Sequence, residues 1–162
     1  MARSRSSNHE SDADRYRRFS VGEPRLENPY VAFLGMSGKP DAALVRELST
    51  GLPFTAFARL QDNLAVTATE LAIPLGIPVR TLARRRAQGR LTTDESDRLV
   101  RVSRVFAATV DLFDGHLDSA RQWWKSEIRG LGYVRPLDAV RTEVGTRAVE
   151  TLIHQLAHGV FP

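Results

Sequence analysis

The residues best suited to chemistry in this chain are arginines gathered around residue 80. Between Leu71 and Thr93 the sequence holds five arginines and no acidic residue. Guanidinium groups bind phosphates through paired, planar hydrogen bonds, and an acid-free cluster of them produces a local positive field suited to a nucleic-acid backbone. The plainer alternative is a solvated helix face, because charged runs on helices are common. The cluster therefore indicates DNA binding if the local fold can present it to a duplex.

Two short predicted helices hold this cluster. Thr67 and Glu70 have the spacing of a capping box, which predicts a helix start, and Gly76 can end that helix with a positive φ. Pro78 stands where the second helix would begin. On the second helix, Val79, Leu82, Ala83 and Arg86 are predicted to share one face, with Arg80, Thr81, Arg84 and Arg85 pointing elsewhere. This is the pattern of a helix-turn-helix, whose second helix enters the major groove with its N-terminal residues near base edges.

The histidines are the residues that could indicate a metal or an enzyme. Glu150, His154 and His158 stand at i, i+4 and i+8 along one side of a predicted helix. Because eight residues cover about 12 Å of helix axis, one ion cannot contact all three side chains. The sequence also has no cysteine, and it shows no glycine-rich phosphate loop or nucleophile motif. We therefore expect no metal, no cofactor and no enzymatic activity; a metal-dependent enzyme using His154 and His158 is a less favoured alternative.

The distribution of charge indicates two partners. The chain has 162 residues, enough for one domain or for two small ones that share a core, and a net charge of +4. Residues 1–91 hold 14 Lys and Arg against 9 Asp and Glu, or +5, whereas residues 92–162 hold 9 against 10, or −1. A basic half and a near-neutral half suggest different binding partners. Because no apolar run approaches the roughly 20 residues that span a bilayer, we expect a cytoplasmic protein without a membrane partner.

Helical periodicity predicts the elements that position these residues. Residues 1–28, rich in Ser, Arg and Asp, are predicted to be a disordered tail. Residues 29–36 form an apolar segment that fits a strand, an irregular plug or one helical turn. Helices are predicted at 41–50, from Pro53 onward, within 67–86, and at 92–113, 117–125, 136–140 and 142–157. The predicted fold is all-α: a helix-turn-helix domain over 29–91 joined to a small helical domain over 92–162, with the long helix 92–113 shared between them.

Several separate blocks of the sequence resemble, in the same order, the Xre/ParS-like antitoxins of RES-type toxin–antitoxin pairs. The blocks are Gly51-Leu52-Pro53, Arg80–Arg86, Gly89–Thr92, Glu95–Leu99, Trp123, Gly132, Pro136-Leu137-Asp138, Thr142-Glu143, Gly145 and His158-Gly159-Val160. The resemblance covers about Tyr30 to Phe161. It implies an Xre-like DNA-binding domain and a C-terminal toxin-binding domain. The toxins of such pairs consume NAD, and the antitoxin covers the toxin's active-site cleft and represses its own promoter.

The resemblance also implies two sets of site residues. For operator DNA, Arg80, Thr81 and Arg84 are expected near base edges, with Arg85 and Arg90 on phosphates. The residues expected to bind the toxin are Trp124, Arg147, Glu150, His154, His158, Gly159, Val160 and Phe161. The apolar end of the chain, Gly159–Phe161, is the expected plug for the toxin cleft.

Two further expectations follow from the helical reading. Trp123 and Trp124 cannot both face inward on one helix, because neighbouring positions lie about 100° apart. Either one ring is in the core and the other is partly exposed, or a loop covers both. A homodimer is expected, because helix-turn-helix proteins commonly read paired half-sites. The alternative within the same fold is a solitary transcriptional regulator without a toxin partner.

Overall fold

The computed structural model describes residues 10–21, 28–36 and 40–159. Within these ranges every regular element is a helix, which confirms the all-α prediction. The α-helices are α1 (Asp12–Val21), α2 (Asp41–Thr50), α3 (Phe54–Leu64), α4 (Ala68–Ala72), α5 (Val79–Gln88), α6 (Thr93–Leu112), α7 (Leu117–Lys125), α8 (Pro136–Ala139) and α9 (Glu143–Ala157). The 3₁₀ helices are η1 (Pro29–Leu34) and η2 (Arg129–Leu131).

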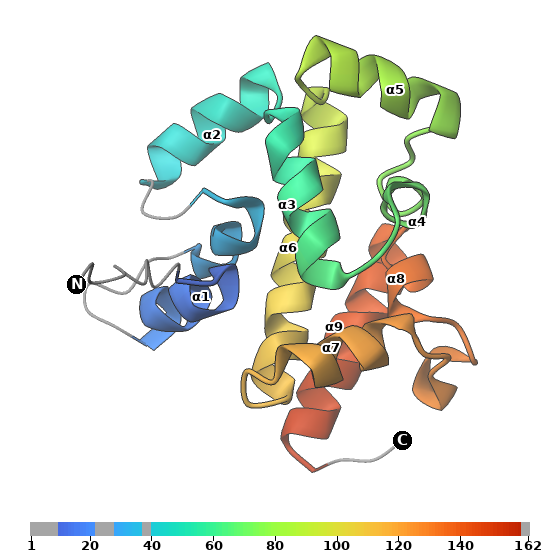
Figure 1. The fold of residues 1–162 in the computed structure, drawn as a ribbon. Coiled ribbons are helices and arrows are strands. Elements are labelled where there is room, and N and C mark those ends of the chain that lie inside the picture. The colour runs from blue at the N-terminus through green and yellow to red at the C-terminus, as the bar shows by residue number, and fades with distance from the viewer. Residues whose placement is uncertain (1–9, 22–27, 37–39, 160–162) are drawn as a thin grey trace, which may run out of the picture.

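The long helix α6 forms the centre of the fold (Figure 1). It begins at a capping box: the Glu95 amide donates to Thr92 Oγ1 at 3.3 Å, and the Thr92 amide donates to Glu95 Oε2 at 2.8 Å. Its buried residues allow it to pack against η1, α2, α3, α7 and α9. The prediction that a long helix joins the two parts of the chain is therefore confirmed.

A row of aromatic rings runs through the core. The ring centroids of Tyr16 and Phe33 are 5.1 Å apart, those of Phe33 and Phe106 are 5.3 Å apart, and those of Phe106 and Trp124 are 5.7 Å apart. Each such pair contributes about 0.5–1.5 kcal/mol beyond the burial of its area. Because the rings belong to α1, η1, α6 and α7, they tie the N-terminal and C-terminal parts of the chain into one core.

Helix α1 corrects the prediction of a disordered tail over residues 1–28. Ala13 and Tyr16 are buried, and the Tyr16 hydroxyl donates to the Asp111 carboxylate at the end of α6. Asp12 is also buried and accepts a hydrogen bond from Asn63 Nδ2 at 2.9 Å. The segment has few aliphatic residues, so hydrophobic periodicity could not detect a helix that docks through one aromatic ring and polar contacts. The rest of the predicted tail, residues 1–9 and 22–27, lies outside the described residues.

The apolar segment at residues 29–36 is the 3₁₀ helix η1. Val31, Ala32, Phe33 and Leu34 are all buried, and η1 contacts α1, α3 and α6. Four consecutive buried apolar residues give no helical periodicity, because such a signal needs exposed positions between the buried ones. Of the three open alternatives, the helical one is therefore the closest to the structure.

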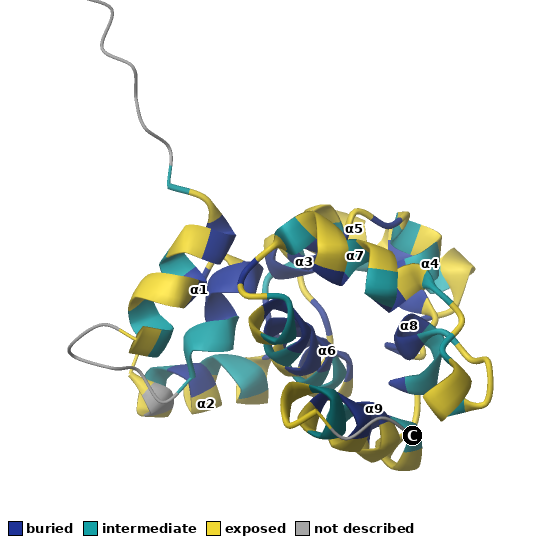
Figure 2. Ribbon diagram, turned by 90° about the horizontal axis from the view of Figure 1, so that it is seen from below, coloured by how far each residue is buried: buried dark blue, intermediate teal, exposed yellow. Residues whose placement is uncertain are grey.

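Helix α9 packs along α6 and leaves one side in solvent. Its N-cap is Thr142, whose hydroxyl accepts a hydrogen bond from the Gly145 amide at 3.0 Å. Thr146, Val149, Leu152 and Ile153 form its buried side. Seen from below, that side of α9 is turned toward α6 and the opposite side is exposed (Figure 2). The element thus presents an outward face near the end of the chain.

Candidate functional site

The segment from α4 to α5 has the predicted helix-turn-helix geometry. The Glu70 amide donates to Thr67 Oγ1 at 3.2 Å, and the Thr67 amide donates to Glu70 Oε2 at 2.8 Å. Gly76 has a φ of +65°, after which the Ile77 amide donates to the Ala72 carbonyl at 3.0 Å and turns the chain toward α5. The predicted capping box and the predicted glycine turn are both confirmed.

Helix α5 stands at the edge of the fold and has one buried side chain, Leu82. Of the residues predicted to share one face with Leu82, the side chains of Val79, Ala83 and Arg86 are exposed, Val79 at 60%. Arg86 lies over the Phe54 ring, with its guanidinium carbon 5.6 Å from the ring centroid. A helix held by so few apolar contacts leaves most of its circumference open to a partner.

Arg80 and Arg84 lie on the open side of α5. At about 100° per residue, both fall nearly opposite the buried Leu82. They are exposed, and within the described ranges neither guanidinium has an ion pair or hydrogen bond. Thr81, at the edge of this side, is half-buried. Paired guanidinium groups on an open helix face can bind guanine edges bidentately. The structure thus brings the three predicted base-reading residues onto one accessible surface.

Arg85 has a partner within the protein. Its Nε donates to both Glu95 carboxylate oxygens, at 3.0 and 2.7 Å, and its side chain is only 14% exposed. Burial tends to raise the pKa of Glu95, but hydrogen bonds from Arg85 and the Thr92 amide outweigh it and hold the pKa below its ordinary value. We therefore assign Arg85 to a link between α5 and the start of α6, in place of the predicted phosphate contact.

Arg90 is also held by the protein, although its side chain is exposed. Its Nη2 donates to the Gly51 carbonyl at 2.9 Å and to Thr50 Oγ1 at 3.2 Å, and its Nε donates to the same carbonyl at 3.2 Å. These bonds fix the guanidinium at the C-terminal end of α2. The predicted phosphate contact would use its remaining N–H groups.

Trp124 is a core residue, which contradicts its place among the toxin-binding residues. It has no exposed surface and packs edge-on against Phe106. Within the described chain, its indole Nε1 has no hydrogen-bond partner. Trp123 is the half-exposed neighbour, with its ring centroid 6.4 Å from that of Phe113. Burial of one tryptophan and partial exposure of the other is the outcome expected for adjacent helical positions.

A groove between α6 and α9 gathers three of the predicted toxin-binding residues. It has a volume of about 350 Å³ and is lined mainly by apolar surface. Its lining residues are Ala108, Asp111, Leu112, Glu150, Ile153, His154, Ala157 and His158. Glu150 pairs with Arg104 Nη1 at 2.7 Å, and the rings of His154 and His158 stack with their centroids 4.2 Å apart. The structure therefore joins these side chains into one feature with an apolar floor and a polar rim.

Asp111 is a groove residue that the sequence did not reveal. Although much of its side chain is exposed, partial burial of the carboxylate raises the pKa of Asp111, and the hydrogen bond from Tyr16 only partly opposes this. The residue lies about 40 positions before its groove partners, so only the packing of α6 on α9 brings them together. No local motif could have identified it.

The other predicted toxin-binding residues lie outside the groove. Arg147 is exposed on α9 and donates to Glu143 Oε1 at 3.1 Å. Gly159 is exposed and directly follows the groove residue His158. Val160 and Phe161 lie outside the described residues.

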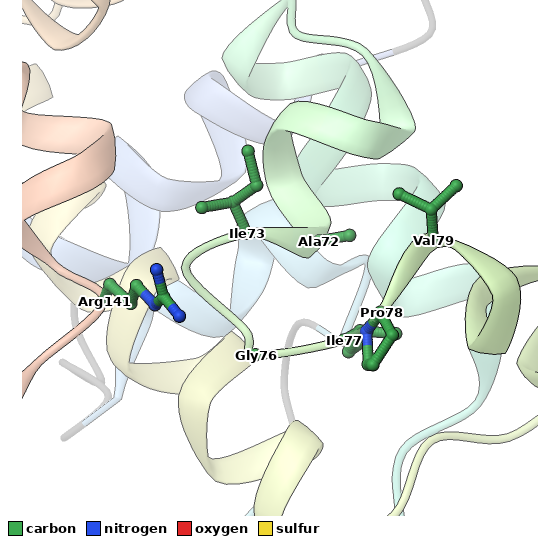
Figure 3. A pocket seen from close by; sticks show the side chains of 7 residues that line it. All are labelled: Ala72, Ile73, Gly76, Ile77, Pro78, Val79 and Arg141. Carbon is green, nitrogen blue, oxygen red and sulfur yellow. The ribbon is translucent and has the colours of Figure 1, made fainter.

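A second hollow lies beside the turn between α4 and α5 (Figure 3). Its volume is about 290 Å³, and its surface is mostly apolar. Ala72, Ile73, Gly76, Ile77, Pro78 and Val79 line it from the helix-turn-helix, and Arg141 lines it from the α8–α9 corner. No local pattern in the sequence predicts this contact between the two halves of the chain.

The histidine pair does not form the geometry of a metal site. Over the described ranges, no group of three or more His, Cys, Asp or Glu side chains is arranged to hold an ion. The imidazole rings of His154 and His158 stack at 26°, so their in-plane lone pairs do not converge on one point.

Among the described residues, no helix combines the length and the apolar character that a membrane span needs.

Two family models match consecutive parts of the chain. Residues 43–104 match the antitoxin Xre-like helix-turn-helix domain, and residues 108–159 match the antitoxin Xre/MbcA/ParS C-terminal toxin-binding domain. The first match ends and the second begins within α6. The α5 surface thus lies in the first matched region, and the α6–α9 groove lies in the second.

Similar proteins carry the same family name. Over 143 residues, which is 88% of this chain and 97% of the relative, the chain is 36% identical to an Antitoxin Xre of Photorhabdus laumondii. It is 36% identical over 129 residues to an Antitoxin Xre of Yersinia enterocolitica, covering 79% of this chain and 87% of the relative. An Antitoxin Xre of Pseudomonas putida is 34% identical over 84 residues, about half of each chain. The chain therefore belongs to the Xre antitoxin family, with a DNA-binding helix-turn-helix domain followed by a toxin-binding domain.

Proposed function

We propose that this antitoxin neutralises a RES-type, NAD-consuming toxin and represses its own operon as a cytoplasmic homodimer. The observation that carries the proposal is the presence of two exposed surfaces at opposite ends of α6. Arg85 links α5 to Glu95 in the first turn of α6, whereas Ala108, Asp111 and Leu112 of its last turns line the groove. At 1.5 Å per residue, about 20 Å of helix separates these positions. Two ligands could therefore be held at once.

For the operator, α5 would enter the major groove. Arg80 and Arg84 have no competing ion pair within the described residues, so their guanidinium groups would read guanine edges, with Thr81 beside them. Arg90 would add a phosphate contact from the end of α2. The resemblance to promoter-repressing antitoxins, the exposed arginine side of α5 and the acid-free stretch around it support this assignment.

For the toxin, the α6–α9 groove would be the contact surface. An apolar floor with a polar rim is the composition of a protein–protein interface. In the core of such an interface, a few desolvated residues supply most of the affinity. Glu150, His154 and His158 line this groove, and Gly159 leads from it into the last residues of the chain. In this proposal the groove binds the toxin surface while Gly159–Phe161 enter the toxin's active-site cleft, and Arg147, nearer the start of α9, makes a separate toxin contact.

Co-expression with the product of the adjacent gene tests the proposal. We expect growth rescue, maintenance of the cellular NAD level and co-purification of the two proteins. A chain that lacks residues 158–162 should bind DNA normally but neutralise the toxin poorly. If the truncated chain neutralised the toxin as well as the complete chain, the role given to the C-terminal end would be refuted.

A solitary regulator is the second candidate function. The observation that favours it is that the whole α5 surface lies within residues 43–104 and includes no residue of the α6–α9 groove. Salt-sensitive binding to the chain's own promoter, together with failure to bind or neutralise the neighbouring gene product, would establish this alternative.

A further inference from the structure

We propose that Arg141, at the corner between α8 and α9, binds a phosphate of the operator backbone beside the turn of the helix-turn-helix. The inference rests on the proposed DNA binding and goes beyond it, because it gives the C-terminal half of the chain a direct contact with DNA. Arg141 lies within residues 108–159, the region matched to the toxin-binding domain.

The geometry that supports this contact is the hollow beside the turn. The Arg141 amide donates to the Asp138 carbonyl at 3.3 Å, which places the residue in the tight connection before the N-cap of α9. From there its side chain reaches toward Ile73 and Gly76 of the turn (Figure 3). The hollow extends to Val79, the first residue of α5, and so adjoins the position of Arg80. A backbone phosphate near a base pair read by Arg80 would lie at this end of the hollow.

The charge of Arg141 is available for such a contact. Most arginines of the C-terminal half pair with carboxylates: Arg101 with Glu143, Arg104 with Glu150, Arg121 with Asp118, Arg135 with Asp138, and Arg147 with Glu143. Arg141 is exposed, and in the part of the chain that the structure describes its guanidinium has no such partner. A cation that needs no ion pair broken can bind a phosphate without that cost.

The lining of the hollow favours a nucleic-acid backbone as its occupant. None of its lining residues carries a carboxylate. A further arginine stands next to it: Arg98 Nη1 donates to the Leu75 carbonyl at 2.9 Å, close to Gly76. Positive charge, the absence of acids and continuity with the α5 surface all point to DNA.

The salt dependence of promoter binding tests this inference. We would measure the affinity of the complete chain for a duplex of its own promoter across a salt series, for the wild type, Arg141→Ala, Arg141→Lys and Arg129→Ala. Arg129 is the matched control, because it is also exposed and, within the described chain, unpaired, and it does not line the hollow. Loss of one phosphate contact should reduce the slope of log affinity against log salt by about one and should weaken binding to all sequences alike.

Each outcome of this measurement decides the inference. A reduced slope for Arg141→Ala, with an unchanged slope for Arg129→Ala and recovery in Arg141→Lys, supports it. An unchanged slope for Arg141→Ala overturns it, as does a loss confined to toxin affinity or self-association, which would make the hollow a protein contact. If the wild type binds no promoter DNA, the proposed function falls first and the inference with it. Thermal unfolding of each variant separates these results from misfolding.

Discussion

At the scale of single residues, the fold decides which arginines can serve DNA. Arg80, Arg84 and Arg85 are nearly adjacent in sequence and have the same chemistry, yet only Arg85 meets a carboxylate. The sequence predicts a cluster of positive charge but not this division, because the partner Glu95 lies in the next helix. The same limit applies to the adjacent tryptophans, of which only Trp124 is fully buried.

The Arg85–Glu95 pair predicts a pH-dependent stability. Glu95→Gln should lower the free energy of unfolding by about 1–3 kcal/mol at neutral pH, because it removes the charge of a largely buried ion pair. The pKa of Glu95 is depressed in the folded state, so its contribution is present above its unfolded pKa, about 4.3. The difference between wild type and variant should therefore shrink as the pH falls below about 4. Urea unfolding at a series of pH values measures it, with the exposed neighbour Asp94→Asn as the control.

The two tryptophans predict a contrast in stability. Trp124→Ala should lower the free energy of unfolding by about 3–5 kcal/mol, because it leaves a cavity beside Phe106. Trp123→Ala, at a half-exposed position, should cost much less. Denaturant unfolding of both variants checks this. Equal losses, or the larger loss for Trp123→Ala, would show that the assignment of the core residue is reversed.

At the scale of elements, the sequence predicts what local signals specify. The capping boxes at Thr67 and Thr92 fix the starts of α4 and α6, and periodic apolar stripes identify α6, α7 and α9. Local sequence signals do not predict helix α1, because its docking depends on the distant residues Asp111 and Asn63. The α6–α9 groove is only partly predictable for the same reason: both helices are predicted, but not the packing that brings Asp111 of α6 beside the histidines of α9.

The docking of α1 predicts that it contributes to stability. Tyr16→Ala should lower the free energy of unfolding by about 3 kcal/mol, because it removes a buried ring from the aromatic row and the hydroxyl that bonds Asp111. The exposed residue Arg18 on the same helix offers the control Arg18→Ala. A thermal melt of Tyr16→Ala that matched the wild type would contradict the role of α1 in the core.

At the scale of the whole molecule, α6 connects the two halves, and direct contacts brace them. Arg121 Nε of α7 donates to the Asn63 carbonyl at the end of α3 at 2.7 Å. Lys125 Nζ donates to the Ala65 carbonyl at 3.3 Å, and Arg135 lies 3.8 Å from the Glu70 carboxylate of the helix-turn-helix. The toxin-binding region therefore holds the segment that leads into the DNA-binding helices.

In the proposed function, one surface of the chain binds the operator and a separate surface binds the toxin. The most direct measurement compares the affinities of two double variants, Arg80→Ala/Arg84→Ala and His154→Ala/His158→Ala, for the promoter duplex and for the product of the adjacent gene. We expect the arginine variant to lose at least about tenfold in promoter affinity with toxin affinity unchanged, since each base reader contributes about 1–3 kcal/mol. The histidine variant should show the reverse pattern. If either variant lost both affinities while remaining folded, or if toxin affinity followed the arginines, the claim of two separate surfaces would be contradicted.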